Sequence, residues 1–149
     1  MDRLKRVGVI EQHASMEEEA AARAMAELER RLVEQQGRLD QLRSFMEDYS
    51  RNVSLNTGGS AGVFALQNYR AFMNRIEIAI DQQASAVDGL MRQYEQARRL
   101  WQEKRTHARA IDKLRTRIEI EQTRQQERVE QHETDEFASR ASMARELQD

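Results

Sequence analysis

Histidines are the side chains of this chain best suited to binding a metal or moving a proton, and there are three of them: His13, His107 and His132. A zinc site gathers several ligands at one point, and a helix supplies two histidines to one face when they are about four residues apart. These three lie far apart in the sequence, and no cysteine is present to complete a site. We therefore expect solvated surface histidines, no bound metal and no cofactor.

The segment from Gly58 to Gly62 invites comparison with a phosphate-binding loop. Such loops end in Gly-Lys-Ser or Gly-Lys-Thr and follow a β-strand, whereas this segment has no lysine and follows a helical pattern. Clustered carboxylates such as Glu17, Glu18 and Glu19 could serve as acids or bases only in an enclosed pocket that shifts their pKa values. We interpret the glycines as a hairpin loop and the carboxylates as a solvated face, and we predict no enzymatic activity.

The composition favours long helices with a narrow apolar seam over a thick globular core. Charged residues make up 34% of the 149 residues and aromatic residues 5%, and proline is absent. No apolar run approaches the roughly 20 residues that span a bilayer, so no transmembrane segment is expected. The lack of cysteines suits a cytosolic protein. The 24 basic and 26 acidic residues are intermixed, which argues against nucleic acid as a partner.

Heptad patterns on both sides of the glycines predict an all-α fold, a long two-stranded antiparallel coiled-coil hairpin. Apolar residues recur at alternating spacings of three and four in a first arm of about 2–55 and a second arm of about 63–145. The loop covers about 56–62, and the chain 1–149 forms a single coiled-coil domain. The seam positions are Met25, Leu28, Leu32, Gln35, Leu39, Leu42, Met46, Tyr49 and Val53, followed by Tyr69, Met73, Ile76, Ile80, Gln83, Val87, Leu90, Tyr94, Ala97 and Trp101.

Each seam has a single polar interruption, Gln35 in the first arm and Gln83 in the second. Folding the chain at the glycines brings the two glutamines opposite each other, in the register that also pairs Tyr49 with Tyr69. An amide pair in the seam would fix the alignment of the arms. The alternative is that each glutamine lies at the edge of the seam with its amide in water.

Beyond Trp101 the heptads weaken, and Ala108, Ile111, Leu114 and Ile118 suggest a change of phase. The register leaves the second arm unpaired beyond about residue 116. The segment from Gln122 to Glu133 is almost wholly polar, and an isolated polar helix is marginal in water. Apolar residues then return behind an acidic pair, in a pattern that suits docking on a partner; the residues of this tail are Asp135, Glu136, Phe137, Ala138, Ala141, Met143 and Leu147.

An apolar patch is predicted on one flank of the hairpin. Counting Met25 as an a position makes Phe45 a g position. The second arm has its own phase, with Ile76 at d, which makes Phe72 a g position too, and g faces g in an antiparallel pair. Phenylalanines at flanking positions, where charged residues are usual, indicate a binding site for a partner. The alternative is that they only widen the core. The other positions on this flank are Arg38 and Ala79 at g and Leu42, Tyr49 and Ile76 at d.

Several short motifs, in order and over nearly the full length, resemble the FliJ family of the bacterial flagellar type III export apparatus. They are Tyr49 with Asn52 before the loop, Asn68-Tyr69-Arg70-Ala71-Phe72 after it, Ile80-Asp81-Gln82-Gln83, Trp101-Gln102-Glu103-Lys104 and Asp135-Glu136-Phe137-Ala138-Ser139-Arg140-Ala141. The resemblance implies a non-enzymatic stalk similar to the central subunit of rotary ATPases. Its partners would be the hexameric export ATPase FliI, the export gate protein FlhA and flagellar export chaperones.

The resemblance also assigns sites and a location. Proteins of this kind are thought to meet the gate through a surface that matches Leu42, Phe45, Tyr49, Phe72, Ile76 and Ala79. The stalk likeness places the chain ends at the ATPase, so we predict that the tail residues Asp135, Glu136, Phe137, Ala141 and Met143 bind it. The expected location is the cytoplasm, at the inner membrane through the export apparatus. The alternatives are a stalk protein of virulence type III secretion and a generic structural coiled coil.

Overall fold

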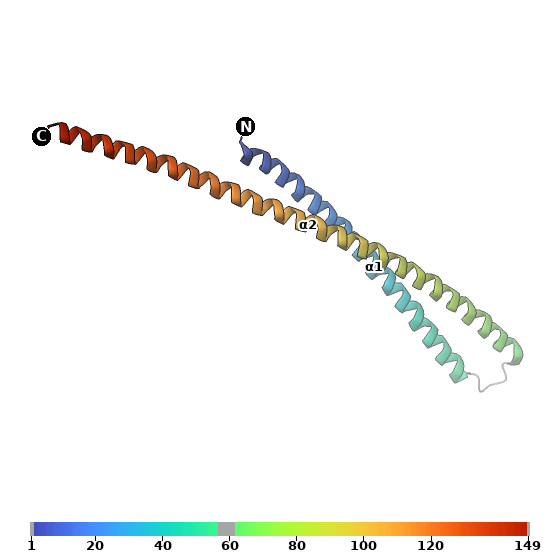
Figure 1. The fold of residues 1–149 in the computed structure, drawn as a ribbon. Helices are drawn as coiled ribbons and strands as arrows, with labels where there is room; N and C mark the ends of the chain where they lie inside the picture. The colour runs from blue at the N-terminus through green and yellow to red at the C-terminus, as the bar shows by residue number, and fades with distance from the viewer. Residues whose placement is uncertain (1, 57–61, 149) are drawn as a thin grey trace. The chain divides into compact units, whose positions relative to one another are not determined.

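The computed structural model describes residues 2–56 and 62–148, and these residues form two long helices. Helix α1 spans Arg3–Asn56 and helix α2 spans Gly62–Gln148, with no strand among the described residues (Figure 1). The two helices pack against each other as a hairpin, so the predicted all-α class is confirmed. The loop that joins them was predicted at about 56–62, and its residues 57–61 lie outside the described part of the chain.

Both helices begin at residues suited to a helix start. The backbone N–H of Leu4 donates to the Asp2 carboxylate at 3.2 Å, which satisfies one of the free donors of the first turn. Gly62 opens α2 with a φ of 66°, a left-handed conformation that costs glycine little. The absence of proline then lets each helix run without interruption.

Contacts divide the chain into two units. The hairpin unit comprises Glu19–Gln102, and the terminal unit comprises Met1–Glu18 together with Glu103–Asp149. Each unit holds a segment of α1 and a segment of α2. The single-domain organisation that we expected from the sequence stays a prediction.

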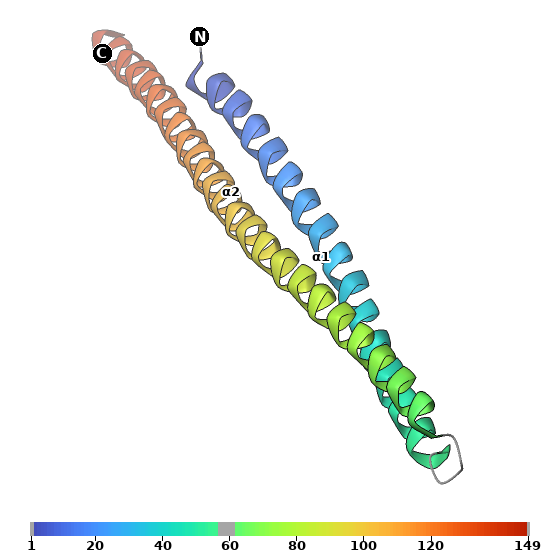
Figure 2. The same ribbon diagram turned by 90° about the vertical axis from the view of Figure 1, so that its right-hand side faces the viewer.

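In the hairpin unit, α1 and α2 run antiparallel and lie side by side in both views (Figures 1 and 2). The centre of their seam is a cluster of three buried residues, Leu32, Leu39 and Val87. Partly buried Ile80, Ala84, Leu90 and Tyr94 pack against this cluster. Apart from Ala84, these residues are seam positions of the heptad count, so the 3,4 periodicity identifies the buried face of both arms.

In the terminal unit, a second cluster joins Val7 and Ala14 of α1 to Ile111 and Ile118 of α2. Leu4 and Ala108 pack against it. Two ion pairs between the helices accompany these apolar residues. The Lys104 ammonium lies 2.9 Å from the Glu17 carboxylate, and the Arg115 guanidinium lies 2.7 Å from the Glu11 carboxylate. The pairing therefore combines a small apolar seam with interhelical ion pairs.

The predicted change of phase after Trp101 is wrong. Ile111 and Ile118 are buried and Ala108 is half-buried, whereas Leu114 is 44% exposed. The buried positions continue the 3,4 spacing of the seam through Lys104, which is half-buried. The pattern looked broken because Lys104 and Arg115 stand where apolar residues are usual.

Contacts between α1 and α2 reach Gln122, whose amide donates to the Asp2 carboxylate at 2.8 Å. This pairing extends slightly further along α2 than the register suggested. From Glu119 to Gln148 every described side chain except Ala141 is exposed, and α2 remains helical throughout. Contacts one turn apart accompany this stretch, including Gln126 with Glu130 and Gln131 with Asp135.

Candidate functional site

The two seam glutamines meet across the hairpin unit. The Gln83 amide nitrogen donates to the side-chain oxygen of Gln35 at 2.7 Å and to the Gln35 backbone oxygen at 2.9 Å. Both side chains are half-buried. The amides therefore bind each other within the seam, and the role of the pair in fixing the alignment stays a prediction.

Four aromatic rings form a cluster towards the loop end of the hairpin unit. The Tyr49 ring centroid lies 4.5 Å from that of Phe72 and 5.8 Å from that of Tyr69. Phe45 meets Phe72 edge-on at 6.1 Å and Tyr49 at 6.4 Å. The Tyr69 hydroxyl lies 3.4 Å from the Ser50 hydroxyl. Tyr49 is the centre of this cluster and ties both helices together.

The six residues of the predicted gate patch differ in exposure. Ile76 is buried at 6% exposure and belongs to the core. Phe45 is 51% exposed, so about half of the residue's surface is open to solvent. The remaining four, Leu42, Tyr49, Phe72 and Ala79, are half-buried. The structure thus places the exposed Phe45 beside the partly covered Leu42, Tyr49 and Phe72, and the patch as a binding site stays a prediction.

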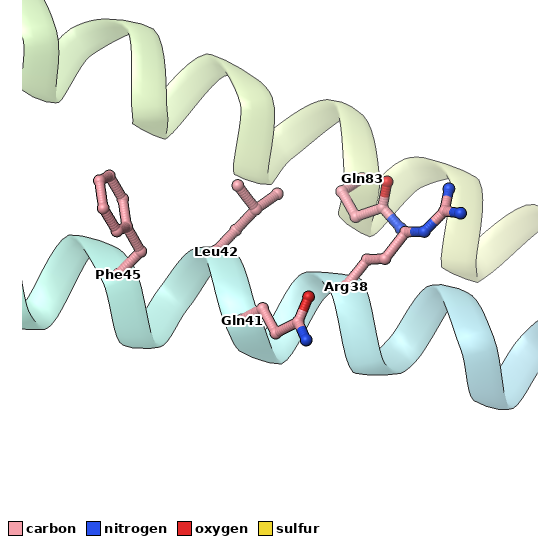
Figure 3. Close-up of a pocket in the computed structure, with 5 residues that line it drawn as sticks. All are labelled: Arg38, Gln41, Leu42, Phe45 and Gln83. Atoms are coloured by element: carbon pink, nitrogen blue, oxygen red, sulfur yellow. The ribbon is translucent and has the colours of Figure 1, made fainter.

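A hollow of about 460 Å³ lies beside Phe45. Figure 3 shows Arg38, Leu42 and Phe45 pointing from α1 towards α2, with Gln83 reaching in from α2. Glu34 holds the Arg38 guanidinium through a contact of 3.2 Å. The lining residues are Arg38, Gln41, Leu42, Phe45 and Gln83, so the hollow offers an apolar wall beside a guanidinium and two amides. Such a surface suits an apolar side chain flanked by polar groups of a partner protein.

The predicted tail residues lie on the C-terminal part of α2, in the terminal unit. Phe137 is 76% exposed and Met143 is also exposed, whereas Ala141 is half-buried. Glu136 pairs with His132 at 3.2 Å and with Arg140 at 4.0 Å. Phe137 and Ala141 are one turn apart and share a face. The tail therefore presents an exposed aromatic side chain on a part of α2 that no other described segment covers.

Ionisable groups in the described residues form surface pairs. A hydrogen bond from Lys104, the charge of that ammonium and the nearby His13 lower the pKa of Glu17. His13 lies 2.9 Å from the same carboxylate. Hydrogen bonds and charges from Glu11 and Glu119 raise the pKa of Arg115. In the described ranges 2–56 and 62–148, no group of three or more metal-ligating side chains occurs and no helix is apolar enough to cross a membrane.

Comparison with known proteins places this sequence in a family. The sequence profile of the flagellar FliJ protein matches residues 4–147. The chain belongs to the FliJ family. A flagellar FliJ protein of Escherichia coli K12 is 30% identical over 132 residues, covering 87% of this chain and 88% of the relative. A flagellar FliJ protein of Salmonella typhi is 27% identical over 130 residues, with the same coverage. No solved structure matches this chain.

One residue of the candidate site in this FliJ family member was missed by sequence reasoning. Gln41 lines the hollow beside Phe45, but it occupies an outer heptad position that carries no apolar signal. Arg38 was placed on the flank by the heptad count, and it too lines the hollow. Only the packed structure of α1 and α2 shows which polar residues lie beside the exposed Phe45 ring.

Proposed function

We propose that this chain is a non-enzymatic component of the bacterial flagellar protein export apparatus. In this role it is a helical stalk that binds the export ATPase FliI and the export gate protein FlhA and escorts export chaperones. Membership of the FliJ family supports the flagellar assignment, and two flagellar relatives favour it over a stalk of virulence secretion. The chain then works at the cytoplasmic side of the inner membrane, through its protein partners.

The observation that carries the gate assignment is the half-exposed Phe45 beside the hollow. An aromatic ring that is held by neighbours on one side and open on the other is a typical binding anchor. Its contacts with Tyr49 and Phe72 restrict its rotamers, which reduces the entropy lost on binding. In this proposal Leu42, Ala79 and the polar rim complete the gate surface, and Ile76 supports it from the core.

The ATPase assignment rests on the terminal unit. The tail residues Phe137 and Met143 are exposed there, and so are Val9 and Ile10 near the start of α1. A polar helix with single apolar anchors gains most of its stability from a partner surface. We assign Asp135, Glu136, Phe137, Ala141 and Met143 to the ATPase contact, with the acidic pair available to basic groups of the ring.

A generic structural coiled coil is the competing function, and a spacer needs neither an exposed anchor nor a tail. A reciprocal binding experiment separates the two functions. Purified FlhA and FliI are each titrated with the wild-type chain, with Phe45→Ala and with Phe137→Ala. We expect Phe45→Ala to weaken FlhA binding alone and Phe137→Ala to weaken FliI binding alone. A wild-type chain that binds neither FlhA nor FliI would favour the spacer function. Variants that bind both partners like the wild type would place the contacts at other residues.

A further inference from the structure

The loop end of α2 carries a second exposed apolar surface. Val63, Phe64 and Leu66 lie in its first two turns and are 69%, 83% and 47% exposed. By the heptad count they occupy e, f and a positions. These positions lie on the opposite flank of α2 from the g position of Phe72. Phe64 is more exposed than Phe45 or Phe137. The surface is therefore distinct from the gate patch, and packing within the hairpin unit leaves Phe64 almost uncovered.

Charge around this surface has one sign. From Tyr49 to Ile76 the sequence contains no Asp or Glu, and this stretch is bounded by Asp48 and Glu77. It carries three exposed arginines, Arg51, Arg70 and Arg75.

These three arginines lie in the stretch that contains no carboxylate side chain of its own. None of the three forms an ion pair with another described residue, whereas Arg30 and Arg38 bind carboxylates on α1. Arg70 lies seven residues after Val63 and therefore occupies the same e position, on the same flank of α2. Two features thus coincide at the loop end: uncovered apolar side chains, and guanidinium groups that have no carboxylate partner among the described residues.

We propose that this loop-end surface, formed by Val63, Phe64, Leu66, Arg51 and Arg70, inserts into the headgroup region of an anionic lipid bilayer. Phe64 and its apolar neighbours enter the boundary between headgroups and acyl chains, and the two arginines bind lipid phosphates. A bilayer needs no shape-complementary groove to accept side chains that project from a helix end. Its uniformly negative surface also matches a stretch that offers only positive charge. This inference does not depend on the proposed FlhA and FliI contacts.

Vesicle binding by the full chain tests the proposal. Vesicles of phosphatidylcholine with about one-third phosphatidylglycerol are compared with pure phosphatidylcholine vesicles in a flotation assay. We expect binding to the anionic vesicles alone, with a partition coefficient that falls as salt screens the arginines. Phe64→Ala should lower it about tenfold, equivalent to about 1.4 kcal/mol. Arg51→Gln and Arg70→Gln should each lower it about fivefold.

Matched controls come from the tail, which plays no part in lipid binding in this proposal. Phe137→Ala removes another exposed phenylalanine, and Arg124→Gln with Arg128→Gln removes two exposed arginines. These variants should bind anionic vesicles like the wild type, and all variants should show the wild-type helix signal. Absence of binding to anionic vesicles overturns the proposal. Equal losses in the Phe64 and Phe137 variants also overturn it, as does a Phe64→Ala chain that binds vesicles normally but loses a protein partner.

Discussion

The Gln83 amide nitrogen lies 2.7 Å from the side-chain oxygen of Gln35, and this contact joins the only polar interruptions of the two central seams. The same nitrogen reaches the Gln35 backbone oxygen. Sliding one arm past the other by a heptad would leave both half-buried amides beside apolar side chains. The cost of an unpaired amide in such a place, about 1–3 kcal/mol, favours the observed alignment.

Cysteines at both glutamine positions test this alignment. The chain has no other cysteine, so Gln35→Cys with Gln83→Cys gives a single possible intramolecular disulfide. Because the two native side chains touch, we expect mild oxidation to yield a crosslinked monomer, detected as a mobility shift on non-reducing gels. Val33→Cys with Gln83→Cys, which places one cysteine at an exposed position of α1, is a control for random collision. Crosslinks that form only between molecules would contradict the hairpin.

Stability should depend on the seam far more than on the exposed flank. Leu39 is buried in the hairpin unit, so Leu39→Ala should lower the free energy of unfolding by about 2–5 kcal/mol. Val33 is exposed on the same helix, and Val33→Ala should change it by less than about 0.5 kcal/mol. Urea unfolding followed by circular dichroism measures both values. Equal effects of the two variants would contradict the packing described for α1 and α2.

The Glu17 carboxylate should titrate below its ordinary pKa of 4.5, because Lys104 hydrogen-bonds to it and stabilises its charged form. A carboxylate with a lowered folded-state pKa adds stability above its unfolded pKa, and this stability is lost as pH falls through the folded pKa. Carboxyl NMR titration should therefore give a midpoint under 4.5 for Glu17. Lys104→Met should move the midpoint upward. An unchanged midpoint in that variant would show that the ion pair is not formed in solution.

Removal of the tail should separate binding from folding. The side chains from Asp135 to Gln148 are exposed apart from Ala141, so a chain truncated before Asp135 loses almost no packing. We expect a nearly unchanged unfolding transition for the paired helices and loss of FliI binding, measured by calorimetry. Phe137→Ala alone should weaken binding about tenfold or more if Phe137 is the anchor. Full FliI binding by the truncated chain would move the ATPase contact elsewhere.

The hairpin and its central seam could be predicted from sequence because one physical factor, apolar periodicity, determines both. The pairing of the terminal unit was harder to predict, since Glu11, Lys104 and Arg115 interrupt the apolar pattern there. Their long side chains pair at the edge of the seam, as in the contact of 2.7 Å between Arg115 and Glu11. Periodicity counts apolar residues and therefore misses a seam that is completed by ion pairs.

The candidate gate site could be located from sequence, but its exposed anchor could not be identified. Phe45 and Phe72 both occupy g positions, and the heptad count treats them alike. In the structure Phe72 is half-buried against Tyr49, with ring centroids 4.5 Å apart, whereas Phe45 is 51% exposed. The difference arises from side-chain packing between the helices, which residue spacing does not specify.

The measurement that most directly tests the central claim is the affinity of purified FlhA for the Phe45→Ala, Phe72→Ala double variant. Alanine at Leu39 is the matched control, because it lowers stability without altering the exposed ring. We predict that the double variant stays folded at the assay temperature and binds FlhA at least about 30-fold more weakly, a loss of about 2 kcal/mol. Folded Leu39→Ala should bind like the wild type. A folded double variant with wild-type affinity would show that this aromatic flank is not the gate-binding site.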